Sequence, residues 1–247
     1  MKFEKTCREP QVGITKAIEE IDGGATLKED AWVRATGGVG MSVVLTDGNV
    51  WEKTGVNLSV VYGTMPREAL QSAAVRGVDH AKGMKPGDRV PFFACGLCRA
   101  MHPKNPFCPT MHFNDRYFHI KHCGETRGLG GIFFDDQSDR DPDTIFEFSK
   151  ECLNNVVNAY GPMNKKHKDN PFTQEQKEWQ LMRRGCYVEF NLSHDRGIVF
   201  GLKTGGRIES TLMSLPRTAW WEYNHQIKKG SPEADLIDAT MNPTEWV

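Results

Sequence analysis

An imidazole, an amide and a guanidinium recur at every second residue in His112, Asn114 and Arg116. In a β-strand this spacing places all three groups on one face of the sheet, where they converge on the same surface. A solvated strand would alternate in the same way, but the neighbouring Phe113 and Tyr117 indicate that this strand is partly buried. The pattern therefore favours a functional surface.

The sequence Gly205-Gly206-Arg207 is a second candidate for a binding site. Two adjacent glycines let the backbone approach a ligand closely, and a guanidinium can hold a carboxylate through two parallel hydrogen bonds. Taken alone, these residues fit a hairpin turn equally well.

The cysteines and histidines between residues 95 and 122 raise the question of a metal site. Cys95, Cys98, His102 and Cys108 are zinc-ligand types at short spacing, but two strand residues three apart point to opposite faces of the sheet. No second pair of cysteines with this spacing is present. A looser divalent-metal site, or ordinary hydrogen-bonded histidines, would account for the remaining set: His102, His112 and His122.

The composition excludes several classes of protein. The chain has 247 residues, of which 38% are hydrophobic, and no apolar run approaches the roughly 18 residues of a membrane helix. A net charge of -1 gives no general attraction to nucleic acid, and no phosphate-binding glycine motif is present. The mixed charges of the N-terminus predict a cytoplasmic protein, and seven scattered cysteines predict reduced thiols.

The hydrophobic pattern predicts an α+β fold with a large antiparallel sheet, because strand-like segments occur in neighbouring pairs and do not alternate with helices. Helices are expected at 11–21, 142–160 and 173–184, the last beginning with a capping box formed by Thr173 and Gln176. Strands are expected at 41–45, 56–62, 90–101, 110–118, 131–134, 187–192 and 198–202.

Three longer blocks resemble the oxygen-dependent coproporphyrinogen oxidase family. They are HPKNPFCPTMHFNDRYF at 102–118, RGLGGIFFDD at 127–136 and RGCYVEFNL at 184–192. The resemblance extends over nearly the whole chain. It implies a single domain over residues 1–247, with helices on both faces of the antiparallel sheet.

The resemblance also implies an activity and its participants. Members of this family use O2 to decarboxylate two propionates of coproporphyrinogen III to vinyl groups in haem biosynthesis, giving protoporphyrinogen IX without a required cofactor. The family pattern makes His112 the proton donor and residues 187–222 the contact between two copies of a homodimer. Substrate contacts fall on Cys98, Asn114, Asp115, Arg116, Gly205, Gly206 and Arg207, and a divalent metal credited to some bacterial members would fall on His102, His112 and His122.

Two departures from the family pattern bear on activity. Cys98 stands where the family has serine, so a thiol, which is a weaker hydrogen-bond donor, replaces a hydroxyl. After Phe118 the family continues through a further strand and two helices, whereas here the pattern resumes at Lys121 and His122. We expect the chain to be continuous between Phe118 and His119 and to leave the cleft wall beside Arg116 open. A catalytically weakened tetrapyrrole-binding or dimer-partner protein is the alternative to an active oxidase.

Overall fold

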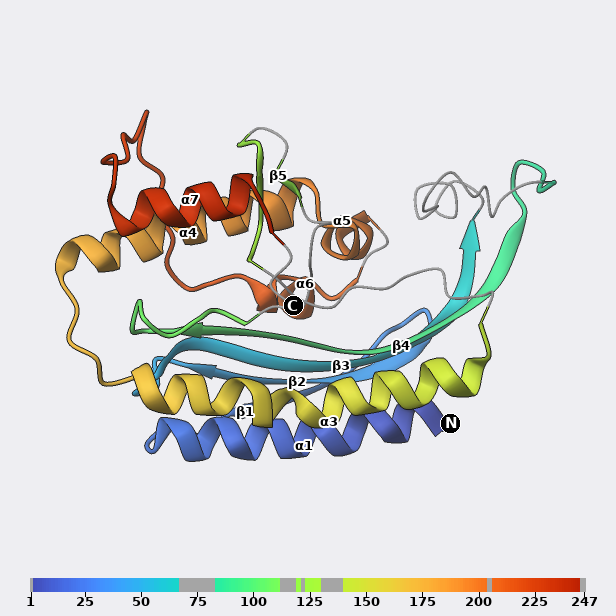
Figure 1. The fold of residues 1–247 in the computed structure, drawn as a ribbon. Coiled ribbons are helices and arrows are strands. Elements are labelled where there is room, and N and C mark those ends of the chain that lie inside the picture. The colour runs from blue at the N-terminus through green and yellow to red at the C-terminus, as the bar shows by residue number, and fades with distance from the viewer. Residues whose placement is uncertain are drawn as a thin grey trace.

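The computed structural model describes residues 2–66, 83–111, 119–120, 123–129, 140–203 and 206–244. Its elements follow the chain in this order (Figure 1): α1 (Lys2–Asp22), β1 (Lys28–Val33), β2 (Gly38–Thr46), β3 (Trp51–Pro66), β4 (Arg89–Pro103), β5 (His119–Ile120), β6 (Glu125–Thr126), α3 (Pro142–His167), α4 (Gln174–Ser193), α5 (Arg196–Lys203), α6 (Ile208–Thr211), the 3-10 helix η1 (Leu212–Ser214) and α7 (Pro232–Met241).

The centre of the fold is a four-stranded antiparallel sheet in the order β1-β2-β3-β4. Helices α1 and α3 lie along one face, and α4, α5, α6 and α7 lie on the other side (Figure 1). The expected α+β fold with helices on both faces of an antiparallel sheet is therefore confirmed. None of the described helices combines the length and the apolar composition that a membrane crossing requires.

The main core lies between the sheet and the pair α1 and α3. The predicted stripe on α1 is confirmed, because Ile14, Ile18 and Ile21 are buried against the strands. Trp51 of β3 is fully buried and stacks on Tyr160 of α3, with ring centroids 6.0 Å apart. Burial of large apolar side chains is the dominant stabilising term in such a layer.

Two of the expected strands are helical. Residues 187–192 belong to α4 and residues 198–202 to α5, so both strand predictions are wrong. The β-branched and aromatic residues in these segments favour strands locally, but α4 buries Leu181, Arg184 and Asn191 on one helical face. The capping box of Thr173 and Gln176 is confirmed.

Other boundaries also differ from expectation. Helix α1 begins at Lys2 and contains Pro10, and α3 continues past Tyr160 to His167 with Pro162 inside it. Strand β1 was not predicted. Of the segments expected as strands at 110–118 and 131–134, all but the first two residues lie outside the described part; Met111 forms a single bridge to Met101.

A buried ion pair fastens α4 to the sheet. Arg184 donates from Nη1 to Glu52 of β3 and from Nη2 to the carbonyl of Pro103 at 2.7 Å. The other Glu52 oxygen accepts from the backbone and hydroxyl of Thr218, at 2.8 and 2.7 Å. Burial opposes the charge of Glu52, but the bonds from Thr218 and Arg184 outweigh it and hold the pKa of Glu52 below its usual value. The contact therefore joins β3, β4, α4 and the segment after η1.

A second buried carboxylate joins the end of α1 to the turn between β2 and β3. Asp22 accepts from the backbone N–H groups of Ala25, Asn49, Val50 and Trp51. Burial works against its charge, but these four donors hold the pKa of Asp22 below its usual value. A side chain at Gly48 would collide with this carboxylate, so the turn requires glycine there.

We predict that Asp22→Ala lowers the free energy of unfolding by about 3 kcal/mol at neutral pH, because four buried donors lose a charged acceptor. Since the folded-state pKa is depressed, this stabilisation is fully present above the unfolded pKa of about 3.9 and is lost as pH falls through the folded value. Urea unfolding of both proteins between pH 7 and pH 3 should show the difference shrinking at the acid end. Glu20→Gln, at an exposed position of the same helix, is the control, and an equal loss in both variants would contradict the assignment.

Candidate functional site

One row of polar side chains crosses the whole sheet. Asp30 of β1 pairs with Ser42 of β2, Ser42 with Asn57 of β3, and Asn57 with Cys98 of β4. Directly opposed residues of antiparallel strands share a face, so the four side chains form one line. Val56, next to Asn57, points into the core under α1. The polar row therefore faces away from α1.

The middle of this row is hydrogen-bonded to α6. The Ser42 hydroxyl donates to Asn57 Oδ1 at 2.9 Å and lies 2.9 Å from the hydroxyl of Ser210 in α6. Asn57 Nδ2 donates to the hydroxyl of Ser59 at 3.0 Å. Ser42 and Asn57 are buried, so α6 is docked on the row through a continuous chain of hydrogen bonds.

Arg207 stands immediately before α6, above the β1 end of the row. Its Nη2 is 2.5 Å from a carboxylate oxygen of Asp30, and its Nε is 3.6 Å from Glu209. The hydrogen bond that Arg207 donates to Asp30 raises the pKa of Arg207, so the guanidinium stays charged. Its Nη1 is buried, and among the described residues it has no hydrogen-bond partner. Within this part of the chain, one guanidinium nitrogen of Arg207 thus has unused hydrogen-bonding capacity.

Gly206 has a packing role that the sequence did not reveal. Its N–H donates to the carbonyl of Gly201 in α5 at 2.8 Å, and a side chain at Gly206 would meet that carbonyl. The close approach that glycine permits is made here to the protein's own backbone. Gly205 lies outside the described residues.

The next row on the same face consists of small residues and one indole. Trp32, Gly40, Ser59 and Gly96 pair across the four strands, two residues along from the polar row. The indole of Trp32 lies over Gly40, where any side chain would collide with the ring. Among the described residues, no heavy atom lies within 4 Å of the position that a side chain at Gly96 would take. A polar row beside small residues and an indole suits a flat ligand that carries both apolar and charged parts.

His102 is buried on this side of β4 and belongs to the interior. Its Nε2 donates to the carbonyl of Ser214 at 2.8 Å, and its ring meets the edge of Tyr187 with centroids 5.4 Å apart. Burial lowers the pKa of His102 to about 4, so the imidazole is neutral at physiological pH. Because Nε2 carries the proton for this bond, only Nδ1 could coordinate a metal ion.

The described residues contain no group of three or more potential metal ligands. Cys95 and Cys98 lie on opposite faces of β4, as the strand periodicity predicts, because Cys95 pairs with the buried Val60 and Cys98 with Asn57. A zinc site that uses both thiols is therefore incompatible with this strand. The proposed histidine site cannot be followed here, since His112 and His122 lie outside the described residues.

The site residues named from the sequence are placed only in part. Cys98, with an exposed thiol, and Arg207 lie on or above the same face of the sheet, at opposite ends of the polar row. The sequence did not identify four residues of this face: Asp30, Ser42, Asn57 and Ser210. The signal that could have indicated them is the alternation of apolar and polar residues around Asn57. Outside the described residues are His112, Asn114, Asp115, Arg116 and the junction between Phe118 and His119.

The family model and the individual relatives that match this chain all carry the name coproporphyrinogen III oxidase. A family model described as coproporphyrinogen III oxidase matches residues 2–119 and 113–246. The "Oxygen-dependent coproporphyrinogen-III oxidase, chloroplastic" of Glycine max is 46% identical over the whole chain and 79% of its own length. The "Oxygen-dependent coproporphyrinogen-III oxidase, mitochondrial" of Homo sapiens is 39% identical over the whole chain and 67% of its length.

The alignments confirm that an internal stretch of the family pattern is missing. The alignment to the soybean relative has 309 positions for the 247 residues here, so about 62 positions lie opposite no residue of this chain. The two matched parts of the family model meet at residues 113–119, where the sequence pattern is interrupted.

The expected location is wrong. The relatives from soybean, tobacco and Arabidopsis thaliana are named chloroplastic, and those from rat and human mitochondrial, which points to an organelle and not to the cytoplasm. Identity of this level over the whole chain, together with the family match on both sides of the interruption, settles the relationship. The chain belongs to the coproporphyrinogen III oxidase family.

Proposed function

We propose that this protein is an oxygen-dependent coproporphyrinogen oxidase, acting in haem biosynthesis on coproporphyrinogen III to give protoporphyrinogen IX. Each of two propionates, –CH2–CH2–COO⁻, reacts with O2 and a proton to give –CH=CH2, CO2 and hydrogen peroxide. The two electrons and the hydrogen that leave the side chain reduce O2, and the C–C bond to the carboxylate breaks. No flavin or haem is required in this scheme.

The observation that carries the proposal is the guanidinium of Arg207, partly unpaired among the described residues, above a sheet face that carries a polar row beside small residues and an indole. Coproporphyrinogen is a flexible apolar macrocycle with four carboxylates, so its site needs guanidinium groups beside an apolar surface. Within the described residues, Nη1 of Arg207 has no hydrogen-bond partner and no heavy atom lies close above Gly96, and Trp32 supplies an apolar surface beside them. We place one substrate carboxylate against Arg207 and the macrocycle over the row that contains Gly96.

The other roles rest on the family resemblance. We propose His112 as the proton donor and Asn114, Asp115 and Arg116 as further substrate contacts. Gly205 and Gly206 are further proposed substrate contacts beside Arg207, and the Cys98 thiol replaces a hydroxyl at the opposite end of the polar row. A divalent metal on His102, His112 and His122 stays a prediction, and the bond from His102 to Ser214 weakens it.

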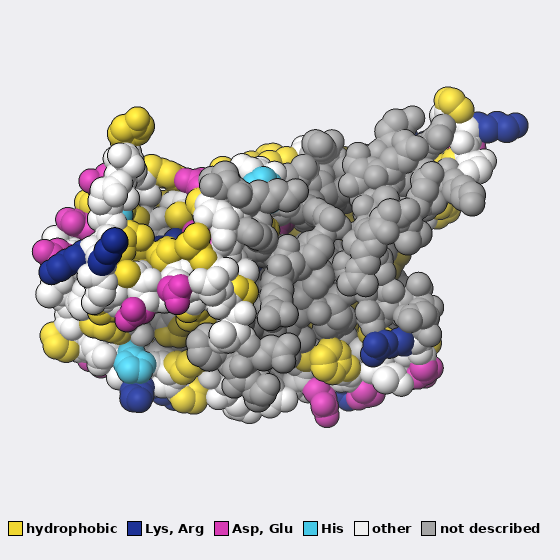
Figure 2. Space-filling model, turned by 45° about the horizontal axis from the view of Figure 1, so that its top comes forward, with side chains coloured by type: hydrophobic (Ala, Val, Ile, Leu, Met, Phe, Trp, Pro, Cys, Tyr) yellow, Lys and Arg dark blue, Asp and Glu magenta, His cyan; other side chains and the backbone are white. Residues whose placement is uncertain are grey.

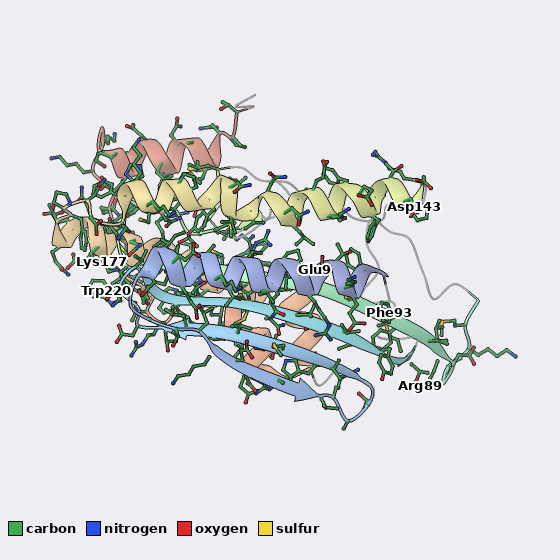
Figure 3. All side chains as sticks on the ribbon, turned by 90° about the horizontal axis from the view of Figure 1, so that it is seen from below. Glu9, Arg89, Phe93, Asp143, Lys177 and Trp220 are labelled. Carbon is green, nitrogen blue, oxygen red and sulfur yellow. The ribbon has the colours of Figure 1, made fainter. Side chains whose placement is uncertain are left out.

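A second candidate function is tetrapyrrole binding with little or no catalysis. The missing positions favour it, and so does the exposure of the sheet at one end. Tyr62 of β3 and Phe93 of β4 are 52% and 47% exposed. Figure 3 shows Phe93 and Arg89 toward the end of β4 that projects beyond α1. Apolar surface of this kind is what the absent strand and helices of the family would be expected to cover.

We also propose that two copies associate through residues 187–222. This range contains exposed apolar side chains, among them Trp220 and Trp221, which are 47% and 60% exposed. They border a cavity of about 350 Å³ that Trp179 of α4 also lines. Figure 2 shows hydrophobic side chains gathered on this part of the surface, around α4 and α7. Exposed tryptophans are enriched at protein interfaces, which supports the family-based expectation of a homodimer.

Aerobic incubation with coproporphyrinogen III should produce protoporphyrinogen IX, measured by porphyrin fluorescence after chemical oxidation. Consumption of O2 should follow the product. An anaerobic sample controls for spontaneous oxidation, which gives coproporphyrin and no vinyl product. Binding of coproporphyrinogen without any vinyl product would overturn the oxidase and leave the binding protein.

Arg207→Ala should weaken substrate handling by about 1.5–3 kcal/mol, because a charged hydrogen bond to a carboxylate is lost. The expected readout is a fall of roughly 10- to 150-fold in kcat/KM, with Arg207→Lys recovering only part of it, since an ammonium lacks the planar fork. Arg140→Ala, at an exposed site outside the proposed cleft, is the matched control. Equal kcat/KM for Arg207→Ala and the control would remove Arg207 from the site.

Trp221→Glu should shift the protein from dimer to monomer in gel filtration with light scattering, because a charge would be buried in an apolar interface. Val12→Glu, at a position on α1 that is 56% exposed, should leave the assembly unchanged. A wild-type protein that is monomeric at micromolar concentration would refute the dimer.

A further inference from the structure

The backbone on both sides of Arg207 is fixed. The N–H of Gly206 donates to the carbonyl of Gly201 in α5 at 2.8 Å. The carbonyl of Arg207 accepts from the backbone N–H and from the hydroxyl of Thr211, both at 2.9 Å. Because α6 is itself docked on the polar row, the Cα atom of Arg207 is held over the sheet. The direction of the guanidinium then depends on the rotamer of the side chain.

Asp30 is the residue that restrains this side chain. It lies on β1, the outer strand of the described sheet, and the pairing of Asp30 with Ser42 of β2 fixes its backbone. One of its carboxylate oxygens is 2.5 Å from Nη2 of Arg207. A free arginine side chain populates many rotamers, and a charge-assisted hydrogen bond to a fixed carboxylate selects among them. The sheet therefore sets the direction in which the guanidinium points.

The contact divides the donors of the guanidinium. Its five N–H groups lie in one plane. Asp30 accepts from Nη2, and Glu209 lies 3.6 Å from Nε. Nη1 is buried, and no hydrogen-bond partner for it is present among the described residues. Within this part of the chain, Nη1 and the second N–H of Nη2 thus form the end that can hold a carboxylate through two parallel hydrogen bonds.

We propose that Asp30 is a positioning residue, which holds the Arg207 guanidinium so that its Nη1 end receives a carboxylate of the substrate. This inference rests on the proposed function and deepens it, because it names the residue through which the sheet controls the substrate-binding cation. Asp30 does not contact the substrate in this arrangement. It acts through Arg207, and a guanidinium that is already oriented binds more tightly because less side-chain freedom is lost on binding.

Asp30 has two opposing effects on an anionic substrate. Its hydrogen bond orients Arg207, but its negative charge, with that of Glu209, repels a carboxylate at the same site. The Asp30 side chain is half exposed, and solvent weakens the repulsion between charges that are not in direct contact. The hydrogen bond is direct, so the orienting effect is the larger one. Removal of Asp30 should therefore weaken substrate binding, whereas a carboxylate that only competes for Arg207 would give the opposite sign.

The test is the kinetics of Asp30→Ala in the full chain, with coproporphyrinogen III and O2. We expect kcat/KM to fall by about 3- to 10-fold, mainly through a higher KM, because the substrate-binding group is less well oriented. Asp30→Asn should lie between Asp30→Ala and the wild type, since an amide oxygen still accepts from Nη2 without the charge. Glu29→Ala, at the exposed position next to Asp30 but on the opposite face of β1, should equal the wild type.

A double-mutant cycle separates positioning from a general structural role. In an Arg207→Ala background, Asp30→Ala should change kcat/KM by less than about twofold, because Asp30 has no guanidinium left to orient. The melting temperature of Asp30→Ala should stay close to that of Glu29→Ala, since a half-exposed ion pair contributes little to stability. An equal fall in kcat/KM in both backgrounds, or a rise in Asp30→Ala, would overturn the proposal.

The outcomes separate this inference from the proposed function. An active wild type in which Asp30→Ala and Glu29→Ala have equal kcat/KM would remove the role of Asp30 and leave the oxidase. A wild type that binds coproporphyrinogen III without turnover would overturn the oxidase, and the same variants are then compared by their dissociation constants, with the same expected ratios. A wild type that neither binds nor converts coproporphyrinogen III would overturn both.

Discussion

The buried ion pair of Glu52 and Arg184 is the constraint on which the arrangement of the two layers depends. Both side chains are almost fully buried. Arg184 also donates to the carbonyl of Pro103, and Glu52 also accepts from the backbone N–H of Thr218. Removal of one member of such a pair would leave an uncompensated charge, at a cost of about 3–5 kcal/mol. The pair therefore selects one docking of α4 and the following segments on the sheet. That docking carries α6, with Ser210 and the preceding Arg207, over the polar row.

The register of the sheet places apolar and polar residues that alternate along β4 on opposite faces. Along β4, Cys95 and Met101 lie under α1, while Cys98 and His102 point to the face where α6 and η1 lie. A slip of one residue would exchange the two sets, so the core packing of the first set also fixes the position of the second. The residues on the polar face are thus positioned by the packing of the apolar face opposite it.

The interruption of the family pattern at residues 113–119 leaves the central sheet and its main helices in place. The match continues on both sides of the interruption, and the sheet, α1, α3 and α4 form a connected core without the missing positions. The end of β3 and β4 that carries Tyr62 and Phe93 is more exposed than the end that holds His102. A shortened member can therefore keep the sheet and the helices that pack on it.

The sequence by itself determined the family, the α+β class, the stripe on α1, the capping box at Thr173 and the three long strands, because these depend on local periodicity or on long specific blocks. It misassigned residues 187–192 and 198–202, since local β-propensity there is overridden by helix packing on the sheet. It identified Arg207 from the Gly205-Gly206-Arg207 pattern and Cys98 as a substrate contact through the resemblance, but it did not identify Asp30 or Ser42. Only the tertiary structure brought these four residues to one face, because strand register and helix docking are contacts between residues far apart in the chain, which no local pattern encodes.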